Sequence, residues 1–205
     1  MYRTFYAHEN KMISYQDYYS LHHTWETIRA LVDAIIPRTP RLAEEFGRIQ
    51  YYGALDSYTD EYVIYTLNNH YYPLAKSVAD LLDVAGTHLL LDIGSNYSLK
   101  YLDNNGKSAF AELSPENRFK AISLLPDLQS YLTDIPESLG ENQDYVLAVI
   151  NALSRYTLMG YYSEWSGYGS TRLDSPNERI LEYFPTGWKQ VGYPGPSKGY
   201  RALRQ

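Results

Sequence analysis

The sequence predicts a mostly α-helical fold, an irregular helical bundle followed by a long aromatic C-terminal arm rich in glycine and proline. Two observations support this prediction. Apolar residues recur at the three-and-four spacing of amphipathic helices over several segments, and prolines and glycines stand where those segments end. The chain has 205 residues, enough for one well-buried core. We therefore expect a lead-in over residues 1–22, a helical domain over residues 23–160 and an arm over residues 161–205.

The first long helix is expected to begin at Thr24 and to end at Pro37, because proline cannot continue an α-helix. A second helix is expected over residues 41–51, where apolar residues line one side until Gly53 breaks the pattern. Both helices would present one apolar side to a core. The helical spacing of the first segment comes from Trp25, Ile28, Leu31, Val32, Ile35 and Ile36.

The middle of the chain continues the helical pattern over residues 56–85. Pro73 must begin a new helix there or kink the existing one. Gly86 is expected to cap the end of this pattern, because glycine is the usual residue just after a helix. The dipeptide Asn105-Gly106 is typical of a tight turn and would close one small β-hairpin.

Two further helices are predicted before the arm. Ser114-Pro115-Glu116 is a strong helix start, because serine caps a free amide, proline fits the first turn and glutamate complements the helix dipole. This helix is expected to stop near Pro126. Another should begin at Pro136 or Asn142 and run to Tyr162. Its broad apolar stripe predicts a central position in the bundle.

Composition argues against several classes of function. Lys and Arg total 18 against 24 Asp and Glu, a net charge of -6, with no basic cluster, so nucleic acid is not an expected partner. The absence of cysteine excludes disulfides, thiol nucleophiles and cysteine-ligated metal centres. No apolar stretch approaches the roughly 20 residues of a membrane span. The N-terminal residues show neither a secretory signal nor a twin-arginine motif, so we expect a cytoplasmic location.

No catalytic, cofactor-binding or metal-binding residue is predicted in this chain. His22 and His23 are adjacent, so on a helix their side chains would point about 100 degrees apart and would seldom share an ion. The carboxylate pairs Glu44-Glu45 and Asp60-Glu61 are expected on solvated helix faces rather than in an acid/base site. Motifs of zinc proteases, nucleotide-binding loops and serine hydrolases do not occur.

The arm stands out by its aromatic residues, in a chain with 23 tyrosines. Its glycines and prolines prevent a long regular helix, although a short helix is expected over residues 175–183. Exposed aromatic rings are costly in water, so the arm must fold back on its own domain or lie against a partner. The expected partner-docking residues are Tyr161, Tyr162, Trp165, Trp188, Tyr193, Pro194, Pro196 and Tyr200.

Four blocks of sequence carry a resemblance to a known family. Two are Leu31-Val-Asp-Ala-Ile-Ile-Pro-Arg-Thr and Trp188-Lys-Gln-Val-Gly-Tyr-Pro-Gly-Pro-Ser, of which the second is the more specific. The supporting blocks are Leu113-Ser-Pro-Glu-Asn-Arg and Thr157-Leu-Met-Gly-Tyr-Tyr-Ser. In this order along most of the chain, they resemble the gluconate 2-dehydrogenase subunit 3 family, whose members are small noncatalytic subunits.

The resemblance implies a partner, an FAD-dependent large subunit of the glucose-methanol-choline oxidoreductase type that oxidises sugars, sugar acids or polyols. FAD and the catalytic base would then belong to that partner, and no cofactor to this chain. An electron-acceptor subunit accompanies some members of the family. Because the N-terminal residues lack the twin-arginine signal of many members, the expected role is stabilisation or assembly of the dehydrogenase rather than its export.

Two other classes of function stay open. A stand-alone carbohydrate-binding protein or enzyme would stack Tyr and Trp rings on a saccharide and bind its hydroxyls through carboxylates. A self-assembling structural protein would pair its tyrosine-rich surface with copies of itself. Saccharide binding by the isolated chain would favour the first, and its size in solution would test the second.

Overall fold

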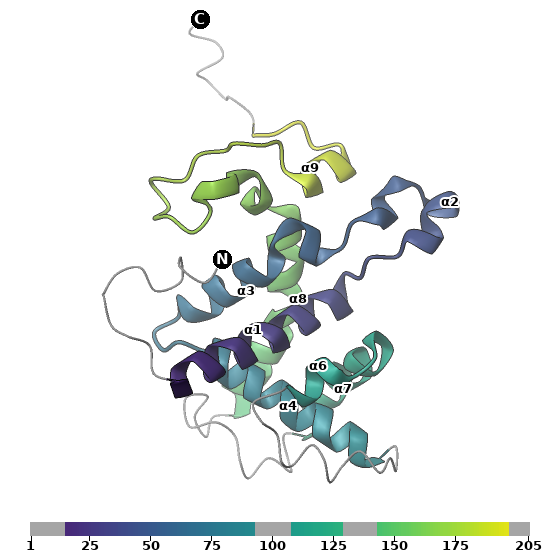
Figure 1. The fold of residues 1–205 in the computed structure, drawn as a ribbon, viewed down its shortest axis with the longest axis vertical. Helices are drawn as coiled ribbons and strands as arrows, with labels where there is room; N and C mark the ends of the chain where they lie inside the picture. Colours follow the sequence, from purple (N-terminus) through teal and green to yellow (C-terminus); the bar gives the residue numbers. More distant parts are fainter. Residues whose placement is uncertain (1–14, 93–107, 129–142, 197–205) are drawn as a thin grey trace, which may run out of the picture.

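The computed structural model describes residues 15–92, 108–128 and 143–196. Within these ranges the chain forms helices, turns and no strand (Figure 1). The predicted mostly α-helical class is therefore confirmed. The hairpin expected at Asn105-Gly106 lies outside the described residues.

Helix α1 (Tyr15–Ile35) runs through the middle of the molecule and contacts α3, α4, α6 and α7 (Figure 1). Its inward side chains Ile28, Leu31 and Val32 are fully buried, as the apolar spacing predicts. The helix begins well before Thr24, so the boundary expected between residues 22 and 23 lies inside it. The early turns were missed because their apolar pattern is weak.

A projecting loop, residues 38–53, replaces the single helix predicted over residues 41–51. Gly47 has a φ of 86° and interrupts the helical backbone, and no residue of the short helices on either side is buried. The backbone N–H of Ala54 donates to the Ile36 carbonyl at 2.9 Å and closes the base of the loop. The loop contains the 3₁₀ helix η1 (Pro40–Leu42), α2 (Ala43–Phe46) and the 3₁₀ helix η2 (Arg48–Tyr51).

The next helices divide at Pro73, as predicted. The 3₁₀ helix η3 (Ala54–Ser57) leads into α3 (Thr59–Asn68), and α4 (Ala75–Asp92) begins just after the proline. Gly86 lies inside α4, so the predicted cap there is wrong. A Cβ at this position would stand 3.0 Å from the backbone of Phe110, and the missing side chain therefore lets α6 approach closely.

The remaining body consists of α6 (Ala109–Glu112), α7 (Pro115–Leu128) and α8 (Gln143–Tyr162). Ser114 caps α7 as predicted, because its Oγ accepts from the Asn117 N–H at 3.3 Å. Pro126 lies within α7 instead of ending it. Helix α8 packs against α3 and also contacts α1 and α7, in agreement with its predicted central position.

One hydrophobic core joins these helices and reaches the end of α8 at Tyr161. The C-terminal segment, residues 161–196, then crosses that end of α8 (Figure 1). Helices α4, α6 and α7 lie toward the opposite end of α8. It contains the 3₁₀ helix η5 (Trp165–Thr171) and α9 (Thr186–Val191). The helix predicted over residues 175–183 is absent, and this stretch forms turns and irregular backbone instead.

Within the described ranges, no helix has both the length and the low polarity needed to cross a membrane.

Candidate functional site

The C-terminal segment folds back on the helical body through the buried ring of Trp165. This side chain is 2% exposed and has its ring centre 5.4 Å from that of Tyr62 and 5.6 Å from that of Tyr65. Its Nε1–H donates to the backbone carbonyl of Tyr58 at 2.9 Å. A fully buried indole with its only polar group satisfied is a strong packing anchor. Trp165 therefore holds the segment to its own domain.

A second anchor joins Arg172 to two residues of the body. Its guanidinium donates to both carboxylate oxygens of the buried Glu61, from Nε at 2.5 Å and from Nη2 at 3.2 Å. The same guanidinium lies 3.7 Å from the ring centre of Tyr58. Bidentate pairing fixes orientation as well as distance. The segment is thus held in one position relative to α3.

Close backbone contacts fix the rest of the segment. A Cβ on Gly187 would overlap the carbonyl oxygen of Tyr161, so α9 lies directly against the end of α8. The Gly167 carbonyl accepts from the backbone N–H groups of Glu182 at 2.8 Å and Tyr183 at 2.9 Å. Hydrogen bonds from Ser170 hold the pKa of Glu182 below its ordinary value. The backbone around residue 182 is therefore preorganised.

These contacts divide the residues expected to dock onto a partner. Tyr161, Trp165 and Trp188 are buried within the chain, so other residues of the same chain cover their rings. The ring of Trp188, for example, meets Phe184 at 5.9 Å and Tyr193 at 5.0 Å between centres. Four residues on that list are exposed: Tyr162, Tyr193, Pro194 and Pro196. Tyr200 lies outside the described residues.

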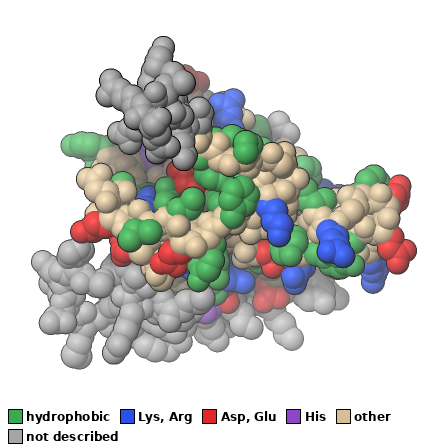
Figure 2. All heavy atoms as spheres, turned by 90° about the horizontal axis from the view of Figure 1, so that it is seen from above, with side chains coloured by type: hydrophobic (Ala, Val, Ile, Leu, Met, Phe, Trp, Pro, Cys, Tyr) green, Lys and Arg blue, Asp and Glu red, His purple; other side chains and the backbone are tan. Residues whose placement is uncertain are grey.

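The structure adds exposed apolar residues that the sequence interpretation missed. Ile180 is 64% exposed and Tyr183 65%, although they stand on the fixed backbone described above. The sequence signal for this exposed patch is the largely apolar run Ile180-Leu-Glu-Tyr-Phe. Most of this run falls within the short helix that was predicted over residues 175–183. Hydrophobic side chains gather across this side of the molecule (Figure 2). We name the exposed set the aromatic face: Tyr162, Ile180, Leu181, Tyr183, Phe184, Val191 and Tyr193.

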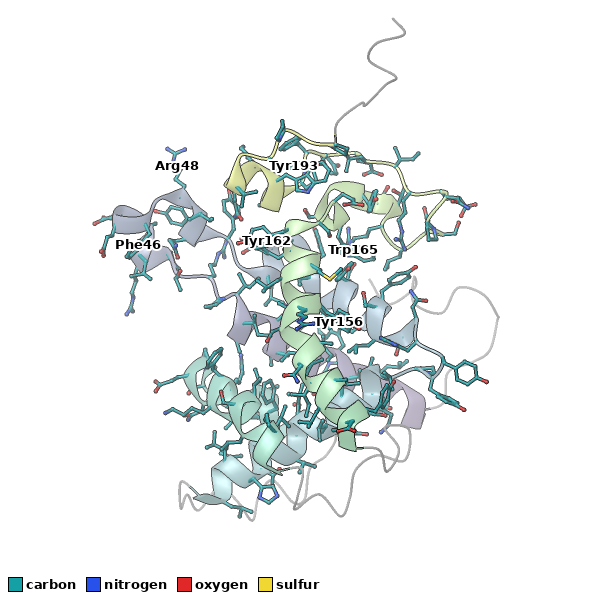
Figure 3. All side chains as sticks on the ribbon, turned by 180° about the vertical axis from the view of Figure 1, so that it is seen from behind. Phe46, Arg48, Tyr156, Tyr162, Trp165 and Tyr193 are labelled. Atoms are coloured by element: carbon teal, nitrogen blue, oxygen red, sulfur yellow. The ribbon has the colours of Figure 1, made fainter. Side chains whose placement is uncertain are left out.

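The projecting loop also exposes large apolar side chains. The Tyr161 hydroxyl donates to the Tyr52 carbonyl at 3.3 Å and joins the base of the loop to the end of α8. Phe46 and Arg48 point outward from the loop, while Tyr162 and Tyr193 belong to the C-terminal segment (Figure 3). The exposed apolar residues of the loop are Leu42, Phe46, Ile49, Tyr51 and Tyr52.

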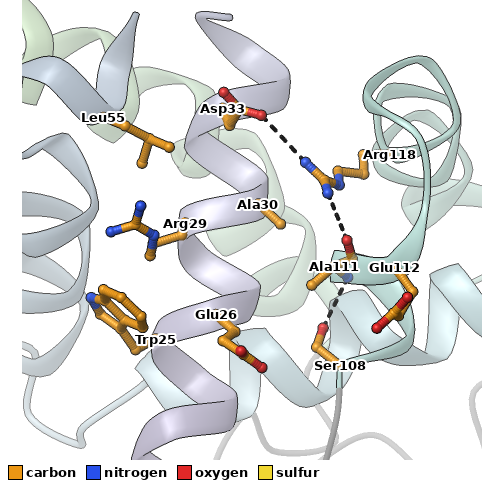
Figure 4. A pocket seen from close by; sticks show the side chains of 10 residues that line it. All are labelled: Trp25, Glu26, Arg29, Ala30, Asp33, Leu55, Ser108, Ala111, Glu112 and Arg118. Atoms are coloured by element: carbon orange, nitrogen blue, oxygen red, sulfur yellow. Dashed lines mark hydrogen bonds and ion pairs between the residues drawn. The ribbon is translucent and has the colours of Figure 1, made fainter.

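A separate cleft of about 540 Å³ lies over α1, between η3 on one side and α6 and α7 on the other (Figure 4). Its charged lining is mixed in sign. Arg118 donates to Asp33 at 3.3 Å and to the Ala111 carbonyl at 2.6 Å. Burial is the main cause that lowers the pKa of Arg118. The lining residues are Trp25, Glu26, Arg29, Ala30, Asp33, Leu55, Ser108, Ala111, Glu112 and Arg118.

Next to this cleft, His23, Asp83 and Ser108 form a hydrogen-bonded group. The His23 Nε2 lies 2.5 Å from Asp83 Oδ2, and the Ser108 hydroxyl donates to Asp83 Oδ1 at 2.7 Å. A nucleophilic serine needs its hydroxyl bonded to the base itself. Here both groups bond to the carboxylate instead, so the arrangement joins α1, α4 and the start of α6.

The described side chains include no group of three or more His, Asp or Glu residues placed to hold a metal ion. No protein-family model, curated protein or solved structure matches the chain. Support for a function therefore comes from the aromatic face, from the projecting loop and from the sequence blocks that carry the family resemblance.

Proposed function

We propose that this chain is a noncatalytic small subunit that binds a larger protein through the aromatic face and the projecting loop. The observation that supports this function is the exposure of large apolar side chains on a fixed backbone. Ile180, Tyr183 and Val191 are more than half exposed, and buried anchors hold the segment beneath them. Exposed apolar patches of this kind mark interaction surfaces. A preorganised surface also loses little conformational entropy on binding.

The partner that we propose is an FAD-dependent large subunit of the glucose-methanol-choline type, acting on sugars, sugar acids or polyols. The resemblance of the block that begins at Trp188 supports this class of partner. Two residues of the block, Val191 and Tyr193, belong to the aromatic face. The flavin and the catalytic base would reside in the large subunit, and an electron-acceptor subunit could join the same complex.

The proposed role is stabilisation or assembly of that large subunit in the cytoplasm. A subunit that binds only the folded form of its partner stabilises that form by mass action. A preorganised face suits this role, because it would offer its apolar contacts to the folded partner surface at a small entropic cost. The large subunit is therefore expected to lose FAD and to aggregate more readily without this chain.

Coexpression of the full chain with such a flavoprotein tests the proposal. The disruptive variant combines Ile180→Ser, Tyr183→Ser and Val191→Ser, which change exposed side chains and leave the buried anchors intact. The matched control combines Tyr71→Ser, Leu91→Ser and Phe119→Ser, all exposed on the helical body. We expect the control to copurify with the FAD-loaded large subunit and the disruptive variant to lose it. Equal recovery with both variants would contradict the proposal.

A further inference from the structure

Helix α8 packs against the core with one side and turns its opposite side outward. The inward side chains Val146, Leu153 and Thr157 are buried. Seen from behind, α8 lies in front of the other helices of the body (Figure 3). The opposite side, which we name the outer face of α8, is exposed or partly exposed and consists of Asp144, Tyr145, Ala148, Asn151, Ala152, Arg155, Leu158 and Met159.

The outer face of α8 is apolar for a helix side that meets water. Asp144 and Arg155 are the only charged residues of the whole helix. Leu158 is 45% exposed and Met159 55%. Surface helices ordinarily direct charged and polar side chains to solvent, and large apolar side chains gathered on a surface mark an interaction site. The outer face therefore has the composition of an interface.

The two charges of the outer face are opposite in sign and project in the same direction. Asp144 and Arg155 are separated by about three helical turns, so their side chains lie on nearly the same side, about 16 Å apart along the axis. Within the described part of the chain, the Arg155 side chain forms no ion pair, hydrogen bond or ring contact. Its guanidinium therefore has donors for a partner.

Small side chains lie between the two charges. Ala148 and Ala152 stand about one turn apart on this face, midway between Asp144 and Arg155. Helix axes approach to about 8 Å where the side chains at the contact are small. A second helix can therefore pack here closely enough for Arg155 to reach across to it.

This pattern is complementary to itself in an antiparallel arrangement. A pair of α8 helices with its twofold axis midway between Ala148 and Ala152 places the alanines of one copy against those of the other. Arg155 of each copy then faces Asp144 and Tyr145 of the second copy, a carboxylate and an aromatic ring that both attract a guanidinium. A carboxylate accepts several hydrogen bonds, so Asp144 can take this donor in addition to its contacts within the chain. A parallel pair would instead bring like charges together.

We infer that the outer face of α8 binds the same face of a second copy of this chain, as an antiparallel helix pair. Charge complementarity selects this occupant, because the order of acid, alanines and arginine matches its own reverse. A contact along one pair of helices is small for a specific interface, so we expect weak association, with a dissociation constant of roughly 10 µM. The outer face shares no residue with the aromatic face or the projecting loop. Dimerisation therefore goes beyond the proposed docking function and can fail independently of it.

A single introduced thiol tests the arrangement, because the chain has no cysteine of its own. In the antiparallel pair, two copies of residue 151 are offset by about 3 Å along the axis and two copies of residue 159 by about 27 Å. Under mild oxidation of the isolated full chain, we expect Asn151→Cys to form a disulfide-linked dimer, since bridged Cα atoms lie within about 7 Å of each other. Met159→Cys is the control on the same face, and we expect it to stay monomeric. No linked dimer with Asn151→Cys, or equal linkage with both variants, would overturn the inference.

Sedimentation equilibrium of the isolated full chain tests the charge pairing. We expect the wild type to dimerise, and Arg155→Glu to dimerise about tenfold more weakly, because the twofold axis removes the pair in two places. Lys120→Glu is the matched control, since it makes the same change of charge at an exposed residue of α7. Asp144→Lys combined with Arg155→Glu exchanges the two charges and should restore the wild-type dissociation constant. A wild type that is still monomeric at about 100 µM, equal weakening in both single variants, or no restoration by the exchange would overturn the inference.

Discussion

The indole Nε1–H of Trp165 donates to the backbone carbonyl of Tyr58 at 2.9 Å. Tyr58 has a φ of 55°, in the left-handed region that residues other than glycine rarely adopt. The hydrogen bond therefore ties the C-terminal segment to a strained turn at the start of α3. Because Arg172 also covers the Tyr58 ring, the turn and the segment stabilise each other.

Replacing Trp165 should test how much the body depends on the C-terminal segment. Trp165→Phe keeps most of the ring but loses the bond to Tyr58, and we expect a loss of about 1–2 kcal/mol. Trp165→Ala also leaves a cavity among Tyr62 and Tyr65, and the expected loss is about 3–5 kcal/mol. Urea unfolding followed by circular dichroism measures both. A loss below about 1 kcal/mol in Trp165→Ala would show that the segment does not contribute to the fold.

The Arg172 and Glu61 pair should show strong energetic coupling. Either Arg172→Gln or Glu61→Gln leaves the other charge largely buried and unpaired, at a cost of about 3–5 kcal/mol. The double variant removes both charges and should be clearly less destabilised than the sum of the single variants. Urea unfolding of the four proteins completes the cycle. Additive losses would indicate that the two side chains do not interact in solution.

His23 should make stability depend on pH. The hydrogen bond to Asp83 raises the pKa of His23 above the ordinary value of 6.5, against the opposing effect of burial. A raised folded-state pKa means that the stabilisation is fully present below pH 6.5 and is lost as the pH rises through the folded-state pKa. We expect the wild type to have a higher free energy of unfolding than His23→Gln at acidic pH, and this difference to shrink between neutral and alkaline pH.

The free energy of unfolding of both proteins, measured from pH 5 to pH 9, tests the histidine prediction, together with an NMR titration of the imidazole. Other titrating groups cancel in the difference between the two proteins. A difference that grows as the pH rises would contradict a stabilising protonated His23.

Much of the helical body could be predicted from local sequence. The apolar spacing predicts α1 and α8, and Ser114 with Pro115 predicts the start of α7, because periodicity and capping act over a few residues. The projecting loop was missed for the converse reason. Phe46 and its apolar neighbours have helical spacing, but no other part of the described chain buries them, and Gly47 breaks the backbone.

The site depended on contacts that sequence spacing does not encode. As a large aromatic residue in a glycine- and proline-rich arm, Trp165 was predicted to dock onto a partner. Only the fold shows that Tyr62 and Tyr65 pack against its ring. Gly86 resembles a cap, and only the approach of Phe110 explains it as a packing glycine. The sequence identifies the turn residues and the aromatic residues of the arm. It does not indicate which of the aromatic rings face the helical body and which face solvent.

Hydrogen exchange of the chain, free and bound to the flavoprotein, tests the docking account most directly. The account predicts slower amide exchange on binding in peptides that cover residues 42–52 and 180–193. Peptides from α7, which lies toward the opposite end of α8 from the C-terminal segment (Figure 1), should stay unchanged. Protection confined to α4 and α7, or no change at residues 180–193 in a stable complex, would contradict the account.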